Sequence, residues 1–301
     1  MNISPIKLLS FSSSFNSQNK QIRNSYNLPC DTVSFTGKKH ISEEEFSPCA
    51  KEGVAIGKKI LKLSRSNSLT PETLNGILNE NSPVPVQAKD LHELPSEVRN
   101  NFGNVIAHML PGYTPDFQLA VANIYLGAFP KTAKEESNFA ANVAHEYTHV
   151  QQRAKDENYY GILNYTNDID EVTTIARLSQ AMMNQMCKIC QQELYAKEKD
   201  LKKVANLISN NKFDIEKSIG KIDFNRMIEG ASDMLAIQMG KKPEDMKNAI
   251  KGWILQETEN EKEAYTVSAN ILERSKCEPN VKASEALSRE MYSYINKMLQ
   301  G

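Results

Sequence analysis

Three residues near the middle of the chain have the types and the spacing of a catalytic metal site. His145 and His149 are four positions apart, and Glu146 directly follows the first histidine. On a helix both imidazoles project from one face, one turn apart, so both can reach one Zn²⁺ at about 2.0–2.1 Å. The Glu146 carboxylate would then lie beside the open coordination position, where it can take a proton from metal-bound water. The sequence therefore predicts a zinc site with Glu146 as its general base.

The flanking residues predict that this stretch is a buried helix. Thr132 and Glu135 form a capping-box pattern just after Pro130. Apolar side chains then follow almost all round the helix: Phe139, Ala140, Ala141, Val143, Ala144, Tyr147 and Val150. Two histidines and a glutamate are costly in such a helix unless they have a use. The alternative is a core helix with ordinary satisfied polar residues, or a chance match to the motif.

A catalytic zinc site needs a third protein ligand and one open position. No His-x-x-Gly-x-x-His continuation follows the motif, so a downstream glutamate is expected. Glu229 has Asp233 one turn later, which could hydrogen-bond a zinc-binding histidine, but both lie opposite the apolar stripe of their segment. Glu261 lies close to the apolar stripe of its own segment, where an unpaired carboxylate is expensive. Glu261 is therefore favoured and Glu229 is its alternative, with Glu263 and Glu171 as further candidates.

The motif and the residues downstream resemble a known group of enzymes. Residues 145–152 read HEYTHVQQ and residues 261–265 read EKEAY. Together they are similar to a broad set of bacterial gluzincin-type HExxH zinc metallopeptidases, the HExxHxxQ group. The resemblance covers roughly residues 111–275, and it implies a zincin fold, one zinc ion and hydrolysis of peptide bonds. The long helical segment between His149 and Glu261 departs from compact gluzincins.

Residues 117–126 alternate in a way that is typical of a β-strand. A strand followed by the HExxH helix is the order found in zincin folds, where this strand often borders the active-site cleft. An extended peptide or protein substrate could pair with that edge through backbone hydrogen bonds. We therefore expect residues 117–126 to border the site.

The proposed chemistry assigns two proton transfers to Glu146. Zinc would lower the pKa of its bound water to about 7, Glu146 would accept the proton, and the leaving amine would receive it. The developing oxyanion needs a further hydrogen-bond donor. The sequence does not rank the four candidates for this role, Tyr159, Tyr160, Tyr265 and His108.

Composition excludes several other classes of function. With 36 basic and 37 acidic residues the chain has no electrostatic footprint for nucleic acid. No apolar run approaches the roughly 20 residues of a membrane span. Five cysteines suggest no disulfide framework, and Cys187 with Cys190 reads as packing rather than as a metal or redox pair. The apolar stretch after Lys7 is too short for a secretory signal. A cytoplasmic location, or export by a route without a typical signal peptide, is expected.

The expected fold class is mostly helical α+β, with a small sheet packed on the HExxH helix. The domain prediction divides the chain into a disordered Ser/Asn-rich tail (1–48), a small, mostly helical region (49–110), the zincin-like domain (111–275) and a C-terminal amphipathic helix (276–301). Residues 82–85 are expected to form a linker, 96–102 a short helix and 111–115 a loop. Further helices are expected at 169–197, 198–210, 224–240, 244–256, 258–275 and 281–299.

Two rival interpretations remain open. The chain could be an inactive helical interaction module that binds through a methionine-rich helix (Met182, Met183, Met186) or through a C-terminal seam (Leu287, Met291, Tyr294, Met298). That seam could dock within the chain or onto a partner helix. The zinc could instead be structural, which would require a fourth protein ligand, for instance both Glu229 and Glu261.

Overall fold

The computed structural model describes residues 43–96, 106–197, 207, 213–273, 275 and 279–301, and the description below is confined to them. Helices dominate this part of the chain, and a small mixed sheet accompanies them. The mostly helical α+β class is therefore confirmed. Residues 1–42 of the predicted tail (1–48) lie outside the described residues, whereas Glu43–Glu45 form a 3₁₀ helix and an α-helix begins at Pro48. The predicted helices at 96–102 and 198–210 lie outside the described residues except for positions 96 and 207.

The described chain divides into two compact units that do not follow chain order. The first contains the described residues of His40–Lys155 and Glu263–Glu285, and the second contains those of Asp156–Lys262 and Ala286–Gly301. The change of unit falls inside one uninterrupted helix, α10 (Pro243–Glu273). The sequence-based boundaries, in contrast, followed the order of the chain.

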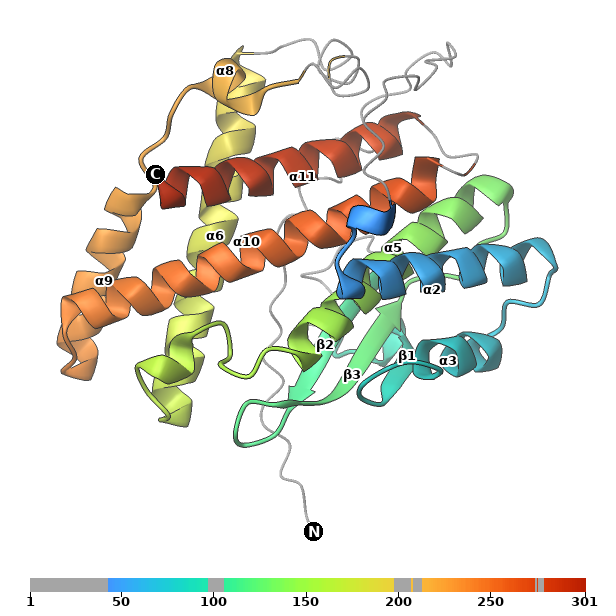
Figure 1. Cartoon of the computed structure of the whole chain (residues 1–301), viewed down its shortest axis with the longest axis horizontal. Coiled ribbons are helices and arrows are strands. Elements are labelled where there is room, and N and C mark those ends of the chain that lie inside the picture. The colour runs from blue at the N-terminus through green and yellow to red at the C-terminus, as the bar shows by residue number, and fades with distance from the viewer. Residues whose placement is uncertain (1–42, 97–105, 198–206, 208–212, 274, 276–278) are drawn as a thin grey trace. The chain divides into compact units, whose positions relative to one another are not determined.

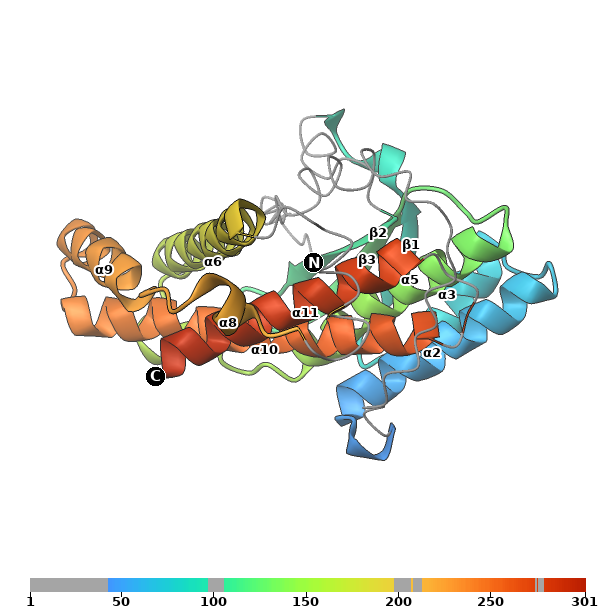
Figure 2. The same ribbon diagram turned by 90° about the horizontal axis from the view of Figure 1, so that it is seen from above.

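The first unit is a small sheet covered by helices (Figure 1). Its helices are η1 (Glu43–Glu45), α2 (Pro48–Arg65), α3 (Pro71–Asn79), η2 (Leu91–Glu93), α5 (Ala133–Ala154) and the last part of α10. Its strands are β1 (Val86–Asp90), β2 (Ala107–Tyr113) and β3 (Leu119–Leu126). Figures 1 and 2 show α2 and α5 side by side, in agreement with their extensive contact.

The sheet has the order β1-β3-β2 within the described residues, with β1 parallel and β2 antiparallel to β3. The expectation that residues 117–126 form the edge of the cleft is wrong, because β3 is the central strand and pairs on both sides. The edge that approaches α5 most closely belongs to β2. The predicted loop at 111–115 is also wrong in part, since residues 111–113 pair with β3.

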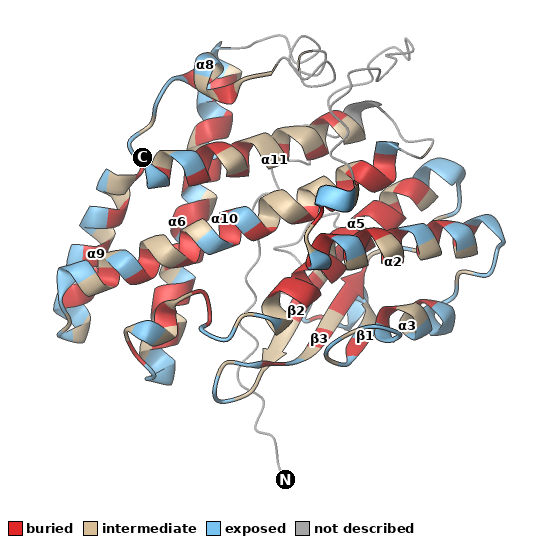
Figure 3. Ribbon diagram, viewed as in Figure 1, coloured by how far each residue is buried: buried red, intermediate tan, exposed pale blue. Residues whose placement is uncertain are grey.

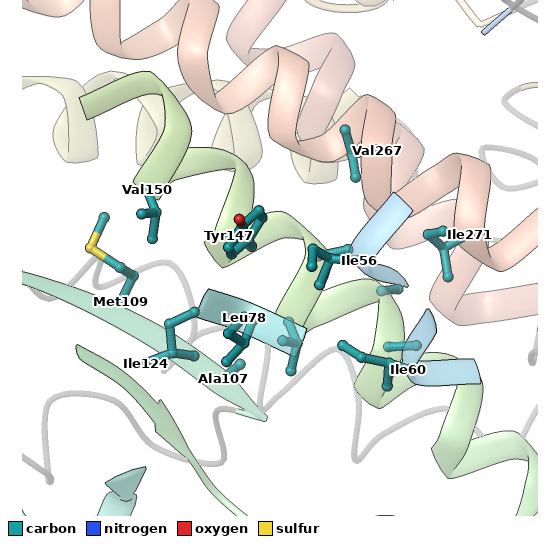
Figure 4. Packing of buried hydrophobic residues seen from close by; sticks show 14 of the residues in the cluster. Ile56, Ile60, Leu78, Ala107, Met109, Ile124, Tyr147, Val150, Val267 and Ile271 are labelled. Atoms are coloured by element: carbon teal, nitrogen blue, oxygen red, sulfur yellow. The ribbon is translucent and has the colours of Figure 1, made fainter. Parts of the chain in front are cut away.

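The core of the first unit lies where the sheet meets α5 and α2. Figure 4 shows Met109 and Ile124 of the sheet below Tyr147 and Val150 of α5, with Ile56 of α2 beside them. Figure 3 shows α5 buried along most of its length. Burial of this many apolar side chains fixes the rotation of α5, and with it the direction in which the motif residues point.

Two glycines allow α2 to approach this core closely. A Cβ atom on Gly53 would lie 2.1 Å from Oγ1 of Thr148, and one on Gly57 would lie 2.6 Å from Cδ1 of Ile271. Real side chains do not approach that closely. The backbone of α2 therefore rests directly on the motif helix and on the end of α10.

The regular elements described in the second unit are all helices. It contains η3 (Ile162–Asn164), α6 (Ile169–Lys197), α8 (Ile215–Ile219), α9 (Asn225–Met239), the first part of α10 and most of α11 (Pro279–Gln300). The prediction of two helices at 244–256 and 258–275 is wrong, because α10 is continuous. No glycine or proline interrupts residues 253–273, and the polar Glu257 and Thr258 at the expected break are buried.

The methionine-rich helix that was considered for partner binding is α6, and its methionine side chains are buried. Met182, Met183 and Met186 are buried, as are Cys187 and Cys190. Burial raises the pKa of the Cys190 thiol to about 12 and that of Cys187 well above its usual value, which suits packing residues.

Residues of the C-terminal seam also pack against the second unit, to which they belong. Met291 and Tyr294 of α11 are buried, and the Tyr294 hydroxyl donates to the Gly220 carbonyl at 2.7 Å. The Tyr294 ring meets Phe224 edge to face. These two seam residues therefore dock within the chain. Among the described helices, none combines the length and the apolar character that crossing a membrane requires.

Candidate metal centre

The helix that carries the motif begins where the sequence predicts. Thr132 caps α5, because its hydroxyl accepts the backbone N–H of Glu135 and the Glu135 carboxylate accepts the N–H of Thr132. From this fixed start, helical periodicity turns His145 and His149 toward the same side. Both imidazoles are buried, with 9% and 7% of the residue exposed.

The two imidazoles are spaced as ligands of one ion. Nε2 of His145 lies 3.2 Å from Nε2 of His149, and the rings meet edge to face. Two ligands of a tetrahedral zinc site with bonds of about 2.0–2.1 Å are about 3.3–3.4 Å apart. The observed spacing therefore fits a shared metal with little adjustment.

Glu261 completes a group that could hold a metal ion. One ligand atom from each of His145, His149 and Glu261 can be chosen so that all three lie within 4.8 Å of one another. Glu261 lies on α10 one turn before Tyr265, whose ring packs edge to face on His145 with centroids 4.5 Å apart. Because the helix is uninterrupted there, the contact of Tyr265 also constrains Glu261.

The other glutamates proposed from the sequence have different partners. Glu229 is exposed on α9 and forms an ion pair with Lys247 at 2.9 Å. Lys247 precedes Glu261 by fourteen residues, or about 21 Å along α10, so Glu229 lies far from that ligand. Glu171 pairs with Lys241 at 3.1 Å. Asp233, the expected partner of a zinc-binding histidine, is exposed.

Glu146 is held by the sheet. Its Oε2 atom accepts the backbone N–H of Met109 at 2.9 Å. Gly127 donates to the Ile106 carbonyl, so in this antiparallel register the N–H groups of Ala107 and Met109 point away from β3. Position 111 has the same outward orientation but is a proline and carries no N–H. The side of β2 that pairs with no described strand therefore faces the carboxylate next to the candidate metal ligands.

Gln152 links His149 to Glu263, the remaining glutamate that the sequence offered as a third ligand. Oε1 of Gln152 lies 2.9 Å from Nδ1 of His149, and its Nε2 donates to Oε2 of Glu263 at 2.7 Å. Gln152 is the last residue of the HExxHxxQ pattern, but the sequence predicted no role for it. Its position three residues after His149, on the same helix face, was the available signal.

Besides His149, the imidazole of His108 on β2 interacts electrostatically with His145. Burial is the main cause that lowers the pKa of His108 to about 4, and the charges of Arg153 and His145 add to it. His108 is therefore neutral at physiological pH. Arg153 also donates to the Tyr113 hydroxyl at 3.0 Å, which ties the end of α5 to the end of β2.

No protein-family model, curated protein or solved structure matches this chain. Any functional conclusion therefore depends on the residues themselves. Two imidazole nitrogens and one carboxylate, with a second carboxylate adjacent, form a donor set that could hold a metal ion.

Proposed function

We propose that this protein is a zinc-dependent metallopeptidase in which Glu146 is the general base. The observation that carries the proposal is the grouping of His145, His149 and Glu261 within 4.8 Å, on helices that also carry Glu146 and Tyr265. Three protein ligands of this kind leave one coordination position open, as catalytic zinc sites require. A structural site would need a fourth protein ligand, and the group found among the described residues has three.

In this proposal zinc, when bound, supplies Lewis acidity toward the substrate carbonyl and the attacking water. Glu146 takes the proton from that water and returns it to the leaving amine. The hydrogen bond from the Met109 N–H orients the carboxylate through one of its two oxygens. General-base catalysis of this kind contributes about 10²- to 10⁴-fold to the rate.

The edge of β2 supports an extended peptide as the substrate. Its outward backbone groups alternate with those that pair with β3, and Pro111 occupies an outward position, where no N–H is needed for the sheet. A peptide could add as a further strand by using the carbonyls of Ala107 and Met109. Its backbone would then run past Glu146, which contacts the same edge.

Metal content tests the proposal first. Elemental analysis of the purified protein should give about one zinc per chain, as expected for a single mononuclear site. His149→Ala and Glu261→Ala should lose most of it. Glu229→Ala is the matched control, since it removes an exposed carboxylate of the second unit, and it should keep the metal. Wild-type protein that binds no zinc after metal is added would refute the proposal.

The chemistry is tested separately with Glu146→Gln. This variant keeps the size of the side chain and an oxygen that can accept the Met109 N–H, so zinc and fold should be retained. Cleavage of a peptide library, followed by mass spectrometry, should fall by at least about 10²-fold. Full residual cleavage by this variant would exclude Glu146 as the base.

A further inference from the structure

The amide of Gln152 lies between an imidazole and a carboxylate, and all three belong to the first unit. Gln152 is only 8% exposed, so its hydrogen bonds are shielded from water. It accepts from His149 at 2.9 Å and donates to Glu263 at 2.7 Å. The contact between Gln152 and Glu263 connects the motif helix to α10, and the contact with His149 extends this connection to a proposed metal ligand.

The chemistry of the three groups gives this chain of contacts a direction. An ionised carboxylate only accepts hydrogen bonds, so Glu263 requires the NH₂ end of the Gln152 amide. The amide oxygen must then face His149. A carbonyl oxygen only accepts, so Nδ1 of His149 must carry the proton and Nε2 is left with its lone pair.

We propose that Glu263 and Gln152 are positioning residues that fix the tautomer and ring orientation of His149 for metal binding. The inference rests on the proposed function for its consequence, but the hydrogen bonds of the relay join protein groups alone. Glu263 is thus assigned a role that differs from that of the third ligand. Residues that hold a metal-binding histidine in this way affect metal affinity by about 10- to 100-fold when removed.

The neighbouring Gln151 provides a matched control. It is also a buried glutamine on α5, and its amide donates to the Tyr147 hydroxyl at 3.1 Å. Gln151→Met removes a buried amide and its hydrogen bond without touching the metal ligands. Gln152→Met makes the same chemical change in the relay.

The first experiment measures zinc affinity by competition with a chelator. Gln152→Met should bind zinc about 10- to 100-fold more weakly than wild type, and Gln151→Met should match wild type. Glu263→Gln should also weaken binding, because a neutral amide at position 263 can accept or donate and no longer selects the orientation of Gln152.

A double variant separates the relay from simple packing. Gln152→Glu alone places two carboxylates side by side and should weaken zinc binding. Combined with Glu263→Gln, the new carboxylate at position 152 can accept from both His149 and the new amide. The double variant should therefore regain affinity that both single variants lose. Loss in the double variant equal to the sum of the single losses would overturn the relay.

A second measurement reads the tautomer directly. Nitrogen NMR of metal-free, histidine-labelled protein should show Nδ1–H for His149 in wild type and a mixture of tautomers in Gln152→Met and Glu263→Gln. If wild type binds no zinc, the proposed function fails, and this measurement still decides the relay. If wild type binds zinc tightly but His149 shows a mixture of tautomers, the relay is refuted and the proposed function is not. The same holds if Gln152→Met binds zinc as tightly as wild type.

Discussion

Tyr265 packs its ring edge to face on His145, with centroids 4.5 Å apart. Among the tyrosines considered as oxyanion donors, it is the one for which a ring contact with a candidate ligand is found. Tyr160 packs on Trp253, and Tyr159 packs on Tyr160. At the scale of single residues, Tyr265 is thus the best candidate for the oxyanion donor that the proposed peptide hydrolysis would require.

We predict that Tyr265→Phe lowers kcat by about 10²- to 10³-fold, the usual cost of removing one oxyanion donor. The phenylalanine ring keeps the packing on His145, so zinc content and unfolding free energy should stay close to wild type. Steady-state kinetics on a cleaved peptide measure the effect. Tyr160→Phe removes a hydroxyl from the second unit and is the control. Equal activity of the two variants would mean that Tyr265 only packs.

Individual residues differ in how much the sequence reveals about them. His145, Glu146 and His149 follow from local helical geometry, because their spacing alone puts them on one side of α5. Glu261 was favoured over Glu229 by its place on an apolar stripe, and the structure brings Glu261 to the histidines. Met109 contributes a backbone N–H, which any residue but proline has, so no sequence signal could have identified it.

At the scale of elements, the close approach of α2 to α5 can be tested through its glycines. We predict that Gly53→Ala destabilises the protein by about 1–3 kcal/mol, because the new methyl group overlaps Oγ1 of Thr148 within the motif helix. This cost outweighs the gain of up to about 1 kcal/mol in helix propensity. Urea unfolding measures the difference, and zinc affinity should fall if α5 shifts.

Gly76 on α3 is the matched glycine. A Cβ atom there meets nothing within 4 Å. Gly76→Ala should therefore stabilise the protein by up to about 1 kcal/mol through helix propensity and a less flexible unfolded chain. If both alanine variants were stabilised, the packing of α2 on α5 would be looser than the structure indicates.

Elements with strong local signals were predictable, and those fixed by distant partners were not. The capping box of Thr132 and the apolar residues after it specify α5. Strand β1 reads VQAKD, and its alternation of Val86 and Ala88 with polar residues is too short to identify a strand without its pairing with β3. Pro111 and Gly112 are typical of a loop, yet the outward position of Pro111 requires no N–H from the sheet.

At the scale of the whole molecule, the chain returns to its first unit through α10. Glu263–Glu285 joins His40–Lys155, although more than one hundred residues of the second unit separate them in sequence. Such a return depends on long-range burial of residues such as Val267 and Ile271. Local periodicity marks them as apolar, but it does not identify their partners, which is why sequence-based boundaries followed the chain.

The stability of the molecule should depend on pH through His108. Its Nε2 atom is buried, and burial lowers the pKa of His108 to about 4 from an ordinary 6.5. Between these values the unfolded chain binds the proton and the folded one does not, so the unfolding free energy falls as pH falls. We predict that about 2 kcal/mol is lost from this group between pH 7 and pH 5.

Comparison with His108→Gln isolates this contribution. The variant cannot titrate at position 108, whereas His145 and His149 titrate in both proteins. The difference between the two proteins therefore reports the titration of His108 together with its electrostatic coupling to His145. Urea unfolding at pH 7 and pH 5 should show that His108→Gln loses about 2 kcal/mol less than wild type. His92 is exposed on η2, so His92→Gln should retain the wild-type pH dependence. If His108→Gln lost as much unfolding free energy between pH 7 and pH 5 as wild type, His108 would be excluded as the source of this pH dependence.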